Sequence, residues 1–211
     1  QVHGNNIALI SQIKSHKSFK SDGIFSESEN QCLWIYTADC IPILFSDLRS
    51  GIVSAIHSGW KGLNNRIIEK TLKLYDSYDC NYKDLFICLG PAISKKNYPV
   101  DKDVAEKVID GIEKTSQTKE SIKCTLKQKI DRYDFLTNDP LNNKVLLDIR
   151  LAAKQQLINL GINKSQISIC PYCTYKEIDL FNSWRRTRKK SVQWSYIISN
   201  KPQENFYEDN S

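Results

Sequence analysis

Short stretches of apolar residues, several of them alternating with polar ones, predict β-strands along most of the chain. The predicted strands are residues 6–13, 33–36, 41–46, 51–57, 85–89, 167–170 and 192–198. Residues 14–30 are polar and rich in turn formers, so they are predicted to form a loop, with His16 as a solvated loop residue.

A helical period replaces the strand pattern after residue 60. One apolar face predicts a helix from about residue 62 to 78, and it is formed by Leu63, Ile67, Ile68, Leu72 and Tyr75. A second amphipathic helix contains Val104, Val108 and Ile112. Asp148 is a predicted N-cap for a third helix that ends at Gly161. Residues 114–143 are mostly charged or polar and indicate no clear element.

Mixed strands and helices without a repeat or linker predict one catalytic domain over residues 1–211, with a polar tail at 200–211. A chain of 211 residues with 40% hydrophobic residues can bury a full core. No apolar run reaches the ~20 residues that span a bilayer, and no secretory signal is visible. Because the chain opens on Gln and contains no Met, we expect a native segment before residue 1.

The cysteine count and the net charge indicate the cellular compartment and the kind of partner. Seven Cys without a framework pattern predict free thiols in a reducing compartment, which favours a cytoplasmic location. The net charge is +6, and much of the excess lies in the run Arg185-Arg186-Thr187-Arg188-Lys189-Lys190. Such a run is either a solvated loop or a site for anions such as phosphate.

Cys40 and His57 are the two residues whose chemistry and position are least typical of a purely hydrophobic core. Cys40 closes a polar turn before one predicted strand, and His57 ends the next, so the two can meet in space. Both are good zinc ligands, and His3 is a third candidate. Spacing alone also fits two buried core residues. Asp39 could orient an imidazole, and glycines 59 and 62 leave free amides at a helix start for an anion.

The sequence Cys170-Pro171-Tyr172-Cys173 suggests a competing chemistry. A strand followed by this motif is similar to a glutaredoxin-type redox pair. That fold places most of the domain after the motif, whereas only 38 residues follow Cys173 here. A structural role is therefore preferred.

Seven motifs in order carry a resemblance to a known family. They are Gln1-Val2-His3-Gly4, Thr37-Ala38-Asp39-Cys40-Ile41-Pro42, Ile56-His57-Ser58-Gly59-Trp60-Lys61-Gly62, Leu89-Gly90-Pro91-Ala92-Ile93, Leu147-Asp148-Ile149-Arg150, Cys173-Thr174-Tyr175 and Phe181-Asn182-Ser183-Trp184-Arg185-Arg186. The chain resembles the laccase-like multicopper polyphenol oxidase family, whose bacterial members are regarded as zinc-dependent purine nucleoside phosphorylases with adenosine deaminase activity.

The resemblance implies that His3, Cys40 and His57 bind one zinc ion and leave its fourth position open, which is typical of catalytic zinc. It implies an α+β (mixed α/β) fold with mixed sheets in α/β/β/α layers, similar to a group of cysteine hydrolases. It also implies purine nucleosides and phosphate as substrates. Three His in the chain cannot build a multicopper cluster, so copper-dependent phenol oxidation is rejected as the main activity and kept only as an alternative.

The implied chemistry assigns roles to further residues. For deamination, water activated at zinc would attack C6 of adenine, with Asp39 as the candidate proton carrier. For phosphorolysis, phosphate would attack the ribose C1′ while Lys61, Arg185 and Arg186 hold it. Three departures bear on the substrate: Lys61 replaces the family's Arg, Pro99 removes a carboxylate after Tyr98, and Trp184 replaces a Tyr. Family members also carry a segment before the first motif.

Two other hypotheses of function remain open. A metal-free cysteine hydrolase would use Cys40 as nucleophile and His57 as base. A nucleic-acid-binding module would combine the basic run with Trp184 and Trp194 as stacking platforms, although nucleic acid is not the expected partner.

Overall fold

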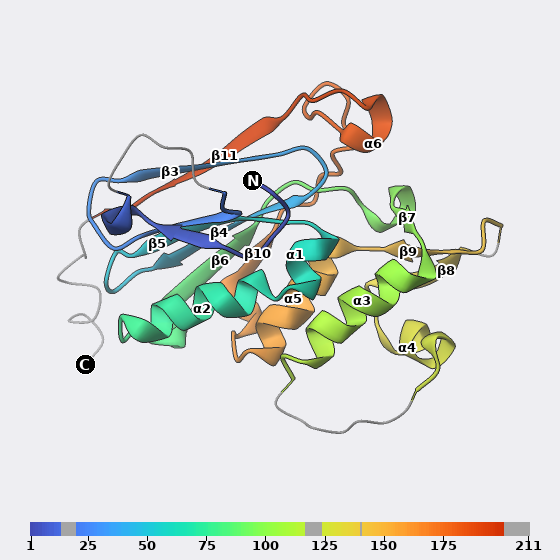
Figure 1. Ribbon diagram of the computed structural model, residues 1–211, viewed down its shortest axis with the longest axis horizontal. Coiled ribbons are helices and arrows are strands. Elements are labelled where there is room, and N and C mark those ends of the chain that lie inside the picture. Colours follow the sequence, from blue (N-terminus) through green and yellow to red (C-terminus); the bar gives the residue numbers. More distant parts are fainter. Residues whose placement is uncertain (14–19, 117–123, 140, 201–211) are drawn as a thin grey trace.

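A six-stranded mixed sheet forms the centre of the fold in the computed structural model, which describes residues 1–13, 20–116, 124–139 and 141–200 (Figure 1). Its strand order is β1-β2-β5-β4-β6-β10. The strands are β1 (Ile7–Leu9), β2 (Gly23–Ser26), β5 (Val53–Ser58), β4 (Ile41–Asp47), β6 (Leu85–Leu89) and β10 (Ile167–Ile169). The two outer pairs are parallel and the inner pairs antiparallel, so the sheet is mixed.

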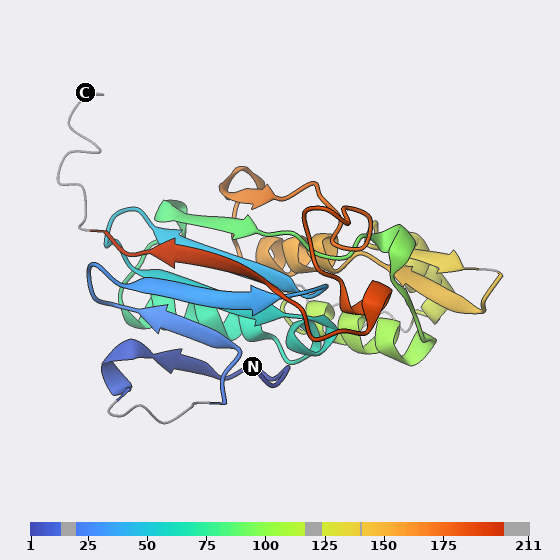
Figure 2. The same cartoon turned by 90° about the horizontal axis from the view of Figure 1, so that it is seen from above.

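Two smaller sheets complete the strand structure. The antiparallel strands β3 (Cys32–Thr37) and β11 (Gln193–Ile198) cover part of one face of the large sheet, as Figure 2 shows from above. Leu33 and Ile35 of β3 pack there on Val53 and Ala55 of β5. The third sheet has the order β7-β9-β8 and consists of β7 (Pro99–Val100), β9 (Lys144–Leu147) and β8 (Leu136–Asp139).

Helices cover the opposite face of the large sheet (Figure 1). The α-helices are α1 (Trp60–Asn64), α2 (Ile67–Ser77), α3 (Lys102–Glu113), α4 (Leu126–Arg132), α5 (Ile149–Asn159) and α6 (Trp184–Thr187). Short 3-10 turns lie at Ile10–Gln12, Tyr82–Asp84, Lys95–Asn97 and Lys164–Gln166. The apolar faces of α2, α3 and α5 enter one core with the large sheet, so the described elements form helix, large-sheet and small-sheet layers.

Most predicted elements are confirmed with shifted ends. Six of the predicted strands correspond to β3, β4, β5, β6, β10 and β11. The second and third predicted helices correspond to α3 and α5, and Asp148 caps α5 by accepting hydrogen bonds from the main-chain N–H groups of Arg150 and Leu151. Gly161 follows α5 with a φ of +96°, a conformation that favours glycine.

Several local predictions are wrong. The predicted loop at 14–30 contains β2, and the predicted strand at 6–13 is β1 followed by a 3-10 turn. The predicted helix at 62–78 is two helices, because Arg66 adopts a left-handed φ of 56° between α1 and α2. Strands β7, β8 and β9 and helices α4 and α6 were not predicted. His16 and residues 201–211 of the predicted tail lie outside the described residues.

Candidate metal centre

The side chains of His3, Cys40 and His57 converge at one end of the large sheet. One ligand atom of each lies within 4.8 Å of those of the other two. Cys40 directly precedes β4, and His57 lies in β5 opposite Pro42 of β4, so strand pairing brings the two together. His3 reaches the site from the N-terminal loop, with its ring centroid 4.8 Å from that of His57. The geometry therefore joins the three predicted ligands.

Gly59 leaves room for this cluster. It is the N-cap of α1, and a Cβ at this position would lie only 2.6 Å from Sγ of Cys40 and 3.9 Å from the His3 ring. The φ of −97° is open to any residue, so the close approach and not the backbone conformation requires glycine here.

Asp22 is the residue of this site that the sequence analysis missed. Its carboxylate is fully buried and lies 2.9 Å from Nδ1 of His57. It also accepts hydrogen bonds from the main-chain N–H groups of Val2, His3 and Gly4. A signal was present in the sequence, because Asp22 immediately precedes the apolar run that forms β2, but that run was assigned to a loop.

Charges and burial shift the pKa values of the cluster. Burial, followed by the negative charges of Asp39 and Asp22, raises the pKa of the Cys40 thiol to about 12. Burial lowers the pKa of His57, against the opposing effect of its hydrogen bond to Asp22. Burial acts to raise the pKa of Asp22, but its hydrogen bonds outweigh this and the pKa is lowered. At neutral pH we therefore expect a neutral thiol, a neutral imidazole and an ionised Asp22.

Asp39 does not orient an imidazole, contrary to the prediction. Its Oδ1 accepts a hydrogen bond of 2.8 Å from the Thr174 hydroxyl, and its Oδ2 accepts one of 2.6 Å from the main-chain N–H of Arg185. The carboxylate thus ties the turn before Cys40 to the first turn of α6. The residue that orients His57 is Asp22, which is distant in sequence but paired with it across β2 and β5.

The three predicted phosphate ligands differ in what their cationic groups contact. Arg186 donates hydrogen bonds of 2.7–2.8 Å to three main-chain carbonyl groups, those of Thr174, Tyr175 and Phe181. This guanidinium stabilises the surrounding loop, so the structure does not support its prediction as a phosphate ligand.

Arg185 and Lys61 keep donors available. The Arg185 guanidinium lies 4.8 Å from the ring centroid of Tyr98 and donates one hydrogen bond, of 3.2 Å, to the carbonyl of Pro99. The Nζ of Lys61 lies 5.7 Å from the Trp60 ring centroid. Both groups can therefore still bind an anion.

The other candidate residues lie in separate surroundings. Cys170 and Cys173 are both free thiols. No helix begins at Cys170 or Cys173, so the structure does not provide the helix N-terminus that a glutaredoxin-type pair requires. Trp184 starts α6, whereas Trp194 lies among the exposed aromatic rings of the β3–β11 sheet, 5.3 Å from Tyr36 and 6.3 Å from Trp34.

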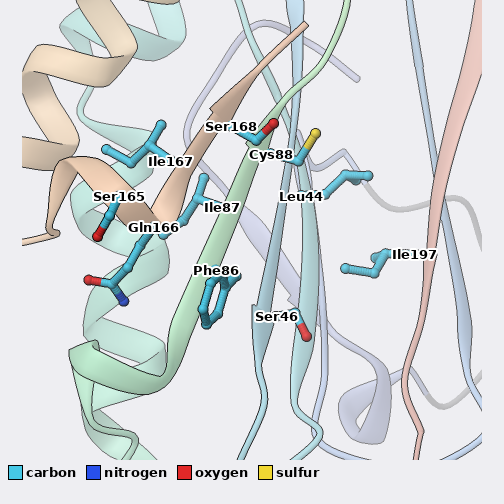
Figure 3. Close-up of a pocket in the computed structure, with 10 residues that line it drawn as sticks. All are labelled: Leu44, Ser46, Phe86, Ile87, Cys88, Ser165, Gln166, Ile167, Ser168 and Ile197. Carbon is cyan, nitrogen blue, oxygen red and sulfur yellow. The ribbon is translucent and has the colours of Figure 1, made fainter.

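A hollow of about 510 Å³ lies away from the metal cluster, on the β4, β6 and β10 surface beside β11 (Figure 3). Its lining includes Leu44, Phe86, Cys88, Ser168 and Ile197, and none of the three candidate ligands. Within the described residues, no helix combines the length and apolarity needed to cross a bilayer.

Comparisons with known proteins agree on one family. The family model described as multi-copper polyphenol oxidoreductase laccase matches residues 1–200. A purine nucleoside phosphorylase of Synechocystis sp. is 38% identical over 184 residues, which cover 85% of this chain and 68% of that protein. A purine nucleoside phosphorylase of Haemophilus influenzae is 31% identical over 198 residues, which cover 92% of this chain and 72% of that protein.

Solved structures share the fold. The YfiH protein of Bacillus licheniformis matches with a TM-score of 0.77 at 25% identity, covering 95% of this chain and 72% of that chain. YlmD of Geobacillus stearothermophilus matches with the same TM-score, identity and coverage. These likenesses confirm the predicted mixed α/β fold with mixed sheets.

Proposed function

The chain belongs to the multi-copper polyphenol oxidoreductase laccase family, and from this membership and the site geometry we propose that it is a zinc-dependent enzyme acting on purine nucleosides. The resemblance indicated by the sequence motifs is thereby confirmed at the level of the family. Phosphorolysis of adenosine- or inosine-type nucleosides and deamination of adenosine are the proposed reactions. The names of the relatives support the nucleoside substrate.

The observation that carries the proposal is the convergence of His3, Cys40 and His57. Two imidazole nitrogens and one sulfur form a donor set that suits zinc, and three protein ligands are typical of catalytic sites. The pairing of His57 with a buried carboxylate is also typical of zinc-binding histidines. The residues present therefore fit a zinc ion better than a multicopper cluster, for which three histidines are too few.

Bound zinc would supply Lewis-acid chemistry beside these residues. Asp22 accepts a hydrogen bond from the protonated Nδ1 of His57, so that Nε2 of the same ring would be left as the ligand nitrogen. Arg185 is the first candidate to hold phosphate, because its guanidinium is stacked on Tyr98 and only partly hydrogen-bonded. Asp39 positions Arg185 through the main-chain N–H at the start of α6. Lys61 is the second candidate cation.

The test is product analysis with zinc-loaded protein and adenosine. Adenine and ribose 1-phosphate that form only with phosphate would indicate phosphorolysis, and inosine without phosphate would indicate deamination. The His57→Ala variant is the matched inactive protein. Absence of all these products from a zinc-replete sample would refute the proposal.

The metal-free cysteine hydrolase remains a second candidate because of one observation. The carboxylate of Asp22 orients the base His57, which lies near the thiol of Cys40. The same arrangement of carboxylate, base and thiol occurs in thiol hydrolases. His3 separates the two candidates, since a hydrolase of this kind needs no third ligand. Stoichiometric zinc that is lost in His3→Ala would support the metalloenzyme, whereas metal-free protein with a reactive Cys40 would support the hydrolase.

A further inference from the structure

We propose that Asp22 is a positioning residue for the candidate metal centre, in which a single carboxylate holds both the His3 loop and the His57 ring in the metal-binding arrangement. This inference rests on the proposed function, because it requires that His3, Cys40 and His57 bind a metal ion.

Asp22 is itself firmly placed. Its side chain is fully buried, and its main chain bonds to both neighbours of β2. The N–H of Asp22 donates a hydrogen bond of 2.9 Å to the carbonyl of Asn6, and its own carbonyl accepts one of 2.6 Å from the N–H of His57. A carboxylate held this way can fix the geometry of the groups that bond to it.

The first partner is the main chain around His3. The carboxylate accepts hydrogen bonds from three successive N–H groups, at 3.1 Å from Val2, 2.8 Å from His3 and 2.7 Å from Gly4. Consecutive N–H groups that surround an anion in this way form a nest. His3 has a φ of 59°, which non-glycine residues seldom adopt. The Asp22 carboxylate therefore selects the loop conformation that points the His3 ring at the cluster.

The second partner is the His57 ring. The Oδ1 atom of Asp22 lies 2.9 Å from Nδ1 of His57, and the carboxylate can only accept at this position. The proton is therefore on Nδ1, and the Nε2 lone pair is free for a metal. Cys40, the third ligand, is placed by β4 without help from Asp22. Loss of the carboxylate should loosen two ligands of three.

The experiment compares metal affinity in wild type, Asp22→Asn and Asp47→Asn. Asn keeps the size of Asp22, but one of the two acceptor atoms becomes an N–H₂ donor that faces other donors. Asp47 is a matched control, because it is also buried and accepts hydrogen bonds from the main-chain N–H groups of Arg49 and Ser50, at the far end of β4 from Cys40. The probe is Co²⁺, and its binding is monitored by the absorption band of the bond between cobalt and thiolate.

We expect Asp22→Asn to weaken Co²⁺ binding by about 10- to 100-fold, as is typical for partners of metal-bound histidines, while Asp47→Asn binds as wild type does. If wild type binds Co²⁺ and Asp22→Asn changes the affinity by less than twofold, the role of Asp22 is overturned and the metal centre is left intact. Wild type that binds neither Co²⁺ nor Zn²⁺ would instead overturn the proposed function, and this inference with it.

A second measurement needs no variant. In metal-free wild type, the ¹⁵N spectrum of the His57 ring should show the proton on Nδ1, as the hydrogen bond to Asp22 requires. A purely structural Asp22 that does not set the ring would leave the proton on Nε2, the usual tautomer in water. That result overturns the proposal even if Asp22→Asn fails to fold.

Discussion

Substitution of Gly59 by Ala should weaken metal binding at least 100-fold while the fold survives. The φ of −97° at Gly59 is acceptable for alanine, so the backbone opposes the change little. The new methyl group would instead lie 2.6 Å from Sγ of Cys40. Among the described glycines, Gly59 is the one at which an added Cβ would lie against a candidate ligand atom.

The size of the effect follows from the contact distance. Ordinary van der Waals contact begins at 3.4 Å, so the sulfur or the helix start has to move by about 0.8 Å. Metal–ligand distances hold to within about 0.2 Å. The displacement is several times larger than this tolerance, and Co²⁺ affinity should fall at least 100-fold. Overpacking should lower the free energy of unfolding by about 1–3 kcal/mol.

The assay is Co²⁺ titration by absorbance together with urea unfolding of the metal-free proteins. Gly161→Ala is the control, because the φ of +96° strains alanine while its Cβ has only Tyr82 nearby, at 3.8 Å. It should cost about 1–2 kcal/mol of stability and leave Co²⁺ affinity unchanged. Wild-type affinity in Gly59→Ala would refute the geometry of the cluster, and loss of affinity in both variants would assign the effect to stability.

Three further predictions concern the surroundings of the site. Arg186→Ala should lower the free energy of unfolding by about 2–4 kcal/mol, because three carbonyl groups lose their donor. Arg185→Ala should chiefly raise the KM for phosphate, roughly tenfold or more. Equal effects of the two variants on stability and on KM would contradict this division. His57 and Asp22 have lowered pKa values in the folded chain. The metal-free protein should therefore lose stability as the pH falls below about 6.5, and again below about 4. Urea unfolding that shows higher stability at pH 5 than at pH 7 would contradict this prediction. Tyr75→Phe should cost about 1–2 kcal/mol, because its buried hydroxyl bonds to a serine hydroxyl and a main-chain carbonyl, and should leave Co²⁺ binding unchanged.

The candidate ligand residues could be proposed from the sequence because their chemistry is visible there. Cys40 and His57 stand at the ends of runs whose period predicts strands, and β4 and β5 pair side by side as consecutive strands commonly do. His3 was a third candidate by residue type alone, and the family resemblance added it to the ligand set, since nothing in its local sequence predicts where the loop lies. Residue type and strand period were therefore sufficient to bring together two of the three candidate ligands.

The break between α1 and α2 could not be read from the same kind of pattern. The apolar face runs through residues 63–75 without interruption, yet the helix stops at Asn64. The cause lies in another part of the chain, because α3 approaches closely at Gly111, where a Cβ would lie 2.6 Å from the carbonyl of Leu63. Gln156 of α5 then donates a hydrogen bond of 3.2 Å to that carbonyl. Tertiary contacts ended a helix that local periodicity would have continued.

The choice between Asp39 and Asp22 shows what kind of information was missing. Proximity in sequence to Cys40 favoured Asp39, but strand register decides the partner of His57. Once residues 23–26 form β2 and Gly23 pairs with Ile56, the residue before β2 must lie opposite His57. A shift of this pairing by one residue would turn the side chains of β2 to the other face and take the carboxylate away from both histidines. The candidate metal centre is thus specified by the register of β2 on β5 as much as by the identity of its candidate ligands.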